Sequence, residues 1–433
     1  MRVRAHWPPW NPPAANLLQP DVPAAPAPAR IDPALVAILA GVCAALHVGK
    51  LPPAIPALQA ALGLSLMQAG FLLSMVQAAG MTAGVAFGAL ADGLGPRRSM
   101  LVGLTILALA SALGGAADGA TALMVLRAAE GFGFLLVVLA APALVRRLVA
   151  PERLSTMLGL WGAYMPLATA LALLTGPWVI ALAGWRAWWW GLGALTAAMA
   201  IWLATAIGAE VGGRAMRTGN APSWSARLRS TLATPGPWLV AMAFAMYSGQ
   251  WLAVIGFLPT IYAQAGAAGT VAGALTALAA AVNMIGNIAA GRLLHRGARP
   301  ARLLTTGYVV MGAAAFVAFV GFGAGGGWPI PASVRYGAVL AFSAVGGLVP
   351  ATLFVLALRV APDPGSISAT VGWVQQWSAL GQFGGPPLVA WLAMRTGGWQ
   401  YTWLASGACA LLGLALTAAI ARRITAEAPA RSP

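Results

Sequence analysis

Long apolar runs separated by short polar turns fill the sequence from about residue 31 to its end. A bilayer core takes about 20 apolar residues as a helix. The runs therefore predict an all-α membrane protein with twelve spans, at 34–57, 66–91, 99–117, 121–145, 155–183, 187–209, 236–261, 270–291, 303–323, 331–357, 366–393 and 399–421. The Pro-rich residues 1–30 lack an apolar core and predict a disordered tail rather than a signal peptide.

The composition agrees with a membrane protein and argues against a soluble one. Apolar residues make up 60% of the chain and charged residues 8%, against roughly 45–50% and 25% in soluble domains. The cysteines and histidines show no metal-binding spacing. No nucleophile with a base and no phosphate-holding loop is visible. We therefore expect neither an enzyme, nor a metal site, nor a cofactor.

The arginines predict the orientation. With the amino terminus placed inside, most basic residues fall on inner segments, while Arg186 and Arg395 lie in outer loops. This imbalance follows the positive-inside rule and predicts cytoplasmic termini in a bacterial inner membrane. The net charge of +16 thus reflects the orientation of the protein in the lipid bilayer. It does not indicate a nucleic-acid partner.

The two halves of the chain repeat each other at a nearly constant offset. Gly49-Lys50-Leu51-Pro52 recurs as Gly256-Phe257-Leu258-Pro259, and Arg127 recurs as Arg335. Two pseudo-symmetric bundles of six helices imply a site at their interface, exposed alternately to each side. The predicted organisation is a tail (1–30), a bundle (31–209), a cytoplasmic linker (210–235), a second bundle (236–421) and a tail (422–433).

Three charged residues fall inside predicted spans, namely Lys50, Arg127 and Glu130. Such residues are costly in a bilayer and indicate function. Glu130 is one helical turn from Arg127 and is expected to pair with it, which would leave Lys50 as the uncompensated cation. Prolines directly after Lys50 break its helix, so we expect Lys50 to line a cavity. The alternative is that Lys50 snorkels to the outer headgroups.

The turn between the second and third spans reads Gly-Ala-Leu-Ala-Asp-Gly-Leu-Gly-Pro-Arg-Arg at 88–98. It closely resembles the signature loop of the major facilitator superfamily, and departs from it at Gly93, where the family has a basic residue. The residues at 127–133 are similar to that superfamily's R-x-x-x-G-x-G motif. The resemblance implies the major facilitator fold, with a gating loop that comprises Gly88, Asp92, Gly95, Arg97 and Arg98. The run at 49–56 resembles the cyanate/nitroimidazole permease branch, which implies small, often anionic, solutes.

These features predict a secondary active transporter of a small organic or inorganic anion, monomeric and coupled to protons through Glu130. Two alternatives remain open: a drug-type efflux antiporter of the same superfamily, and a Glu130 that only neutralises Arg127. The other polar candidates could equally be interhelical hydrogen bonds. The expected substrate-binding residues are Lys50, Arg127, Arg335, Tyr164, Tyr247, Gln250, Trp251, Gln375 and Gln376.

Overall fold

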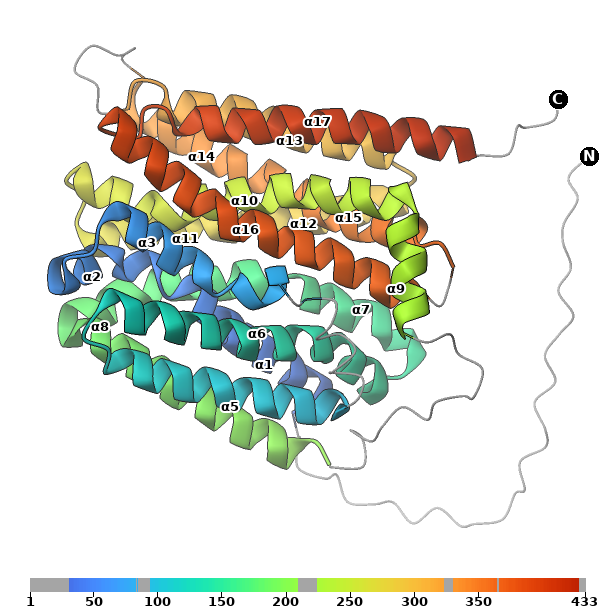
Figure 1. Cartoon of the computed structure of the whole chain (residues 1–433), viewed down its shortest axis with the longest axis horizontal. Coiled ribbons are helices and arrows are strands. Elements are labelled where there is room, and N and C mark those ends of the chain that lie inside the picture. The colour runs from blue at the N-terminus through green and yellow to red at the C-terminus, as the bar shows by residue number, and fades with distance from the viewer. Residues whose placement is uncertain are drawn as a thin grey trace, which may run out of the picture. The chain divides into compact units, whose positions relative to one another are not determined.

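The computed structural model describes residues 31–82, 84, 94–208, 224–322, 330–363 and 366–427. Within these ranges the regular elements are helices (Figure 1), and those from Pro33 onward belong to one compact unit. The prediction of an all-α membrane protein is confirmed, and the predicted spans fall on helices through most of the described part of the chain. Residues 83 and 85–91 of the second predicted span, 209 of the sixth and 323 of the ninth lie outside the described residues.

The first half contains a series of helices with short breaks. They are α1 (Pro33–Gly49), η1 (Pro52–Ala54), α2 (Ile55–Leu62), α3 (Leu66–Met75), α5 (Pro96–Gly115), α6 (Ala120–Leu148), α7 (Pro151–Gly162) and α8 (Tyr164–Ala206). The 43-residue α8 bends at Gly184, whose φ of 82° suits glycine. It therefore contains residues 164–183 of the predicted span at 155–183 and residues 187–206 of the predicted span at 187–209.

The second half begins with a short helix and continues with longer ones. They are α9 (Trp224–Ala233), α10 (Pro235–Gln264), α11 (Gly269–Ala281), α12 (Asn283–His295), α13 (Pro300–Phe319), α14 (Ala332–Gly346), α15 (Leu348–Arg359), α16 (Ile367–Thr396) and α17 (Thr402–Glu427). The prolines at the first turns of α10 and α13 suit helix starts, because their missing N–H groups have no partner there.

Nine helical segments among the described residues are long and apolar enough to cross a membrane. Large apolar side chains also remain on the surface, including Leu109 on α5, Leu182 on α8 and Leu411 on α17. A soluble protein rarely leaves so much apolar surface in water, whereas lipid tails cover it favourably. The exposed leucines therefore mark the lipid-facing sides of these helices.

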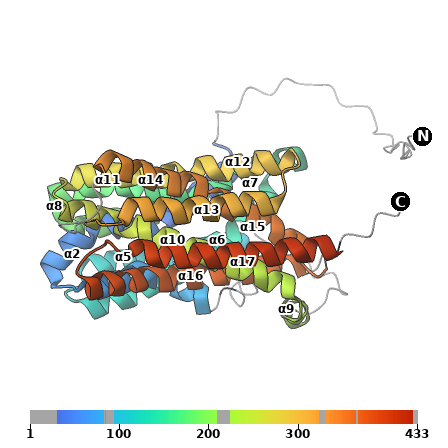
Figure 2. The same cartoon turned by 90° about the horizontal axis from the view of Figure 1, so that it is seen from above.

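In Figure 1 the second half (yellow-green to red) lies above the first half (blue to green), and in Figure 2, seen from above, the second half lies in front. They touch through glycines. A Cβ on Gly70 of α3 would lie 3.2 Å from the Cα of Pro387 on α16, and Gly273 of α11 lies against Leu173 and Pro177 of α8. With the orientation that the arginines predict, these contacts lie at the outer ends of the helices.

The short helix α3 occupies the centre of this arrangement. Ser65 caps its start: the Ser65 hydroxyl accepts from the Gln68 amide, and the Gln68 side chain accepts from the Ser65 amide. Its hydrogen-bonded ladder stops at Met75, and the chain turns at Val76 and Gln77 before helix resumes. This break lies beside the charged residues described next.

Candidate functional site

A cluster of charged side chains is buried inside the first half. Lys50 follows the end of α1, and Arg127 and Glu130 lie one turn apart on α6. Lys50 and Arg127 have no exposed surface, and Glu130 is 1% exposed. Because a buried charge requires partners, the hydrogen bonds of each residue define the site.

Arg127 connects three helices. Its Nη1 donates to Glu130 Oε2 at 2.6 Å and to the His47 carbonyl of α1 at 2.6 Å, and its Nε donates to the Leu72 carbonyl of α3 at 3.4 Å. Its Nη2 is buried and has no hydrogen-bond partner among the described residues. Arg127 therefore keeps one donor group available within the protein interior.

Lys50 contacts the same carboxylate. Its ammonium nitrogen forms an ion pair with Glu130 Oε1, donates to Ser111 Oγ of α5 at 3.0 Å and lies 3.3 Å from His47 Nδ1. It also lies 4.7 Å from the centre of the Trp189 ring, within reach of a cation–π interaction. The expectation that Lys50 would be the unpaired cation is therefore wrong, because Lys50 and Arg127 share Glu130.

The proline break gives Lys50 its position. In an α-helix its carbonyl would accept from the Ala54 amide, but that amide bonds to the Leu51 carbonyl in η1. The Lys50 carbonyl accepts instead from Trp188 Nε1 of α8 at 3.0 Å. The broken backbone is thus satisfied by protein, as expected at membrane depth.

His47 belongs to this cluster and was not among the predicted site residues. It is fully buried, and its Nε2 lies 2.7 Å from Thr196 Oγ1 of α8. Its Nδ1 lies 3.7 Å from Glu130 Oε1. The sequence signal that could have found it is its position one helical turn before Lys50 in an otherwise apolar run.

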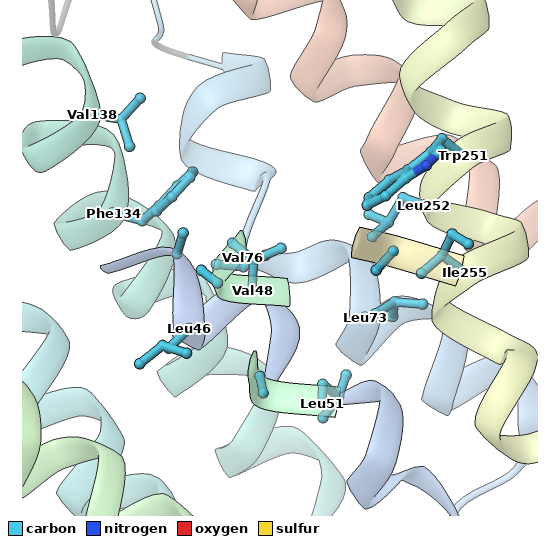
Figure 3. Close-up of a cluster of buried hydrophobic side chains, with 14 of the residues drawn as sticks. Leu46, Val48, Leu51, Leu73, Val76, Phe134, Val138, Trp251, Leu252 and Ile255 are labelled. Atoms are coloured by element: carbon cyan, nitrogen blue, oxygen red, sulfur yellow. The ribbon is translucent and has the colours of Figure 1, made fainter. Parts of the chain in front are cut away.

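An apolar layer separates the cluster from the second half. The Leu72 carbonyl of α3 accepts a hydrogen bond from Arg127. The next residue, Leu73, packs against Gly256 of α10. Figure 3 shows Leu73 facing Ile255 and Leu252 of α10 across this contact. We call the buried residues labelled there the apolar layer: Leu46, Val48, Leu51, Leu73, Val76, Phe134, Val138, Trp251, Leu252 and Ile255.

In the second half, the predicted residues Tyr247, Gln250 and Trp251 belong to a group of neutral polar side chains. Asn283 of α12 donates to the Ser343 carbonyl of α14 at 2.8 Å and to Tyr247 Oη of α10 at 3.1 Å. Trp251 Nε1 donates to Ser343 Oγ at 3.2 Å. Gln250 donates to the Met246 carbonyl at 3.0 Å, and its buried Oε1 has no partner in the described part of the chain.

The remaining polar candidates lie apart from the charged cluster. Tyr164 stacks on Trp161 with their ring centres 4.3 Å apart. Gln376 of α16 donates to the Met81 carbonyl of the first half at 2.9 Å, and its neighbour Gln375 is half-buried. The Tyr164 and Gln376 contacts join separate helical segments, as interhelical contacts do.

Arg335 does not repeat the role of Arg127. It donates to the carbonyls of Ala318 and Val320 at 2.8 Å each, and lies 5.7 Å from the centre of the Phe322 ring. Arg335 therefore holds the end of α13 and shares no hydrogen-bond partner with Lys50 among the described residues.

The predicted gating loop is described only in part. Gly95 has a φ of 82°, and α5 starts directly after it. Arg97 donates to the carbonyls of Ile207 and Ala204 at 2.7 and 2.8 Å, where a cation suits the end of α8. Arg98 is exposed. Gly88 and Asp92 lie outside the described residues.

The described residues form no metal-binding cluster, and they form a hollow away from the charged cluster. No group of three or more His, Cys, Asp or Glu side chains there could hold a metal ion. A hollow of about 400 Å³ lies along α12 and contains none of the predicted site residues; its lining is Ile285, Ile288, Ala289, Arg292, Leu293 and Arg296.

Comparison with known proteins identifies the class of this fold. Residues 37–382 match the Major Facilitator Superfamily, and the chain belongs to this family of membrane transporters. It is similar to the crystal structure of a bacterial homologue of the human lysosomal transporter Spinster, inward-facing and unoccupied. That match has a TM-score of 0.72 at 15% identity, and covers 92% of this chain and 98% of that one.

The inward-facing, occupied structure of the same kind of homologue matches with a TM-score of 0.74 at 14% identity, over 92% of this chain and 98% of the other. At these identities the likeness shows the fold. No curated protein matches the sequence. The resemblance to the cyanate/nitroimidazole permease branch has no support in these comparisons.

Proposed function

We propose that this transporter carries a small anion across the bacterial inner membrane, as a monomer with cytoplasmic termini, and that it couples the anion to a proton. One observation carries the proposal. The buried cluster holds two cations, Lys50 and Arg127, and one carboxylate, Glu130, while Arg127 Nη2 has no partner in the described residues.

The charge of this cluster favours an anionic substrate. A buried charge without a counter-charge destabilises a protein by several kcal/mol. An anion at Arg127 Nη2 or Lys50 would balance the excess positive charge, and at Arg127 Nη2 it would also accept hydrogen bonds from the unused N–H groups. A lipophilic cation, the substrate of the alternative drug-type antiporter, would add to the excess. The electrostatics therefore favour anion transport over drug efflux.

Access to the cluster requires movement of α3. This helix separates Arg127 from α10, and the outer ends of the two halves are in contact through Gly70 and Gly273. In alternating access, the halves separate on one side as they close on the other. We propose that the same rearrangement moves α3 and opens a path to Lys50 and Arg127.

Glu130 is the residue that we propose binds the coupled proton. While it binds both cations, its carboxylate form is stabilised by two ion pairs. A substrate anion that binds Lys50 or Arg127 competes with Glu130 for that cation, which makes the protonated form of Glu130 less costly. Proton and anion would then bind and leave together.

The test is uptake of radiolabelled small anions, cyanate and nitrate among them, into proteoliposomes with and without a pH gradient. We expect accumulation of at least one anion with the gradient. Lys50→Gln should greatly weaken it, whereas Arg395→Gln removes an exposed arginine outside the cluster and should leave it unchanged. Full uptake by a folded Lys50→Gln variant, or transport of lipophilic cations alone, would contradict the proposal.

A further inference from the structure

Two hydroxyl groups in the charged cluster donate their only proton to carbonyls of α8. Ser111 Oγ donates to the Trp189 carbonyl at 2.8 Å, and Thr196 Oγ1 donates to the Leu192 carbonyl at 2.8 Å. A hydroxyl has one proton and two lone pairs. Toward all their other neighbours these two oxygens can therefore act only as acceptors.

The acceptor role of Thr196 determines the tautomer of His47. His47 Nε2 lies 2.7 Å from Thr196 Oγ1, so with the Thr196 proton on the Leu192 carbonyl, Nε2 carries the imidazole proton. Cys43 Sγ, at 3.5 Å, can only donate weakly to the same oxygen. In a neutral imidazole the other nitrogen, Nδ1, is then a bare acceptor, and it faces the Lys50 ammonium at 3.3 Å.

Lys50 consequently has an acceptor for each of its three protons. They are Glu130 Oε1, Ser111 Oγ and His47 Nδ1. Two of these acceptors, Nδ1 and Oε1, lie 3.7 Å from each other. A proton placed between them would therefore compete directly with Lys50 for both.

We propose that His47 is a second proton-binding residue of this transporter, and that a proton at its Nδ1 displaces Lys50 from Glu130. The proton converts imidazole to imidazolium, and the new Nδ1–H donates to Glu130 Oε1. The hydrogen bond from Lys50 to Nδ1 is lost, and no covalent bond other than N–H is formed. The released ammonium becomes the binding group for the substrate anion, a step that rests on the proposed function.

The groups around His47 explain why Lys50 is the cation that moves. Cys43 of α1 shares Thr196 Oγ1 with His47, Lys50 just after α1 lies against His47 Nδ1, and Glu130 and Arg127 approach His47 from α6. Arg127 is fastened by both Glu130 Oε2 and the His47 carbonyl. One proton added at His47 raises the cluster's charge by one, and one bound monoanion restores it, so the proton at His47 is balanced by one monoanion.

The composition of the chain allows a direct test without any substrate. Lys50 is its single lysine, and it has three histidines, His6, His47 and His295. Nitrogen-15 NMR of lysine- and histidine-labelled protein in liposomes, with His6→Gln and His295→Gln, reports one histidine and one lysine side chain. At mildly alkaline pH we expect His47 protonated at Nε2 alone. As the pH falls, imidazolium should form and the Lys50 Nζ signal should shift with the same midpoint.

Variants distinguish proton binding by His47 from a purely structural role of this residue. His47→Gln should abolish the pH-dependent shift of Lys50. Thr196→Val should give a mixture of His47 tautomers, whereas Thr169→Val should not, because Thr169 is a buried threonine of α8 whose hydroxyl has no partner among the described residues. An Nδ1–H tautomer, a His47 that stays neutral, or a Lys50 signal unchanged across the His47 titration would overturn the proposal. Since no anion is present, these outcomes are independent of the uptake screen.

Discussion

The carbonyl group of Val76 occupies the space that a side chain at position 131 would fill. Val76 is where the ladder of α3 stops, and Gly131 follows Glu130 on α6. The absence of a side chain at Gly131 is therefore what lets the broken helix lie directly on the charged cluster.

Gly131→Ala should push α3 away from α6 and expose the cluster. Overpacking of this kind costs about 1–3 kcal/mol, and it should loosen the bond between Leu72 and Arg127. Because Lys50 is the only lysine, its reaction with a water-soluble amine reagent, measured by peptide mass spectrometry, reports the opening. We expect faster labelling in Gly131→Ala than in Gly119→Ala, whose site has open space around it. Equal labelling would contradict the assigned role of this contact.

Glu130→Gln distinguishes proton coupling from simple neutralisation. Glutamine cannot carry the proton, so pH-driven accumulation of the anion should be lost while counterflow exchange is preserved. Removing one partner of a buried ion pair costs about 3–5 kcal/mol, so the melting temperature must be measured alongside. Glu152→Gln, at an exposed acid on α7, is the matched control. Normal proton-driven accumulation in folded Glu130→Gln would exclude the coupling role, and loss of both activities would favour the structural one.

Arg335→Gln should affect stability rather than transport. The arginine bonds the carbonyls of Ala318 and Val320, and losing such partners costs about 1–3 kcal/mol. We expect a lower melting temperature than in Arg395→Gln, with unchanged anion uptake per folded molecule. Lost uptake at an unchanged melting temperature would instead assign Arg335 to the substrate path.

Ser225→Cys tests the proposed orientation. Ser225 lies on α9, at the junction of the halves that the arginines place in the cytoplasm. In a background with Cys409→Ser, where the remaining Cys43 is buried, a membrane-impermeant thiol reagent should not label it in intact cells. Ala268→Cys, exposed in the turn before α11, should be labelled. The reverse pattern would invert the topology.

The sequence predicted the fold because the bilayer restricts it. A chain that crosses lipid must satisfy its backbone within helices, so apolar runs indicate spans, and a charge within a run indicates a site. Which buried charges contact one another across different helices was not predictable in this way. Spacing relates Arg127 to Glu130 on one helix, but the contact between Lys50 and Glu130 joins positions 80 residues apart.

The repeat suggested that Arg335 shares the role of Arg127, and the structure does not bear this out. Arg127 corresponds to Arg335, but at the same offset Glu130 corresponds to Ala338. Without a carboxylate one turn away, the guanidinium of Arg335 bonds backbone carbonyls instead. A shared residue type at matching positions therefore predicts shared ancestry of the halves, while the neighbours decide the role.

The apolar layer over the cluster has a consequence for energy conservation. A proton site open to water on both faces would let protons slip across unaccompanied and dissipate the membrane potential. Here Val48, Val76 and Leu73 are buried apolar side chains of that layer, and apolar side chains offer a chain of water no hydrogen-bond partners. If Glu130 carries the proton as proposed, proton movement has to wait for the helices to move, and the tightness of coupling is set by packing as much as by acidity.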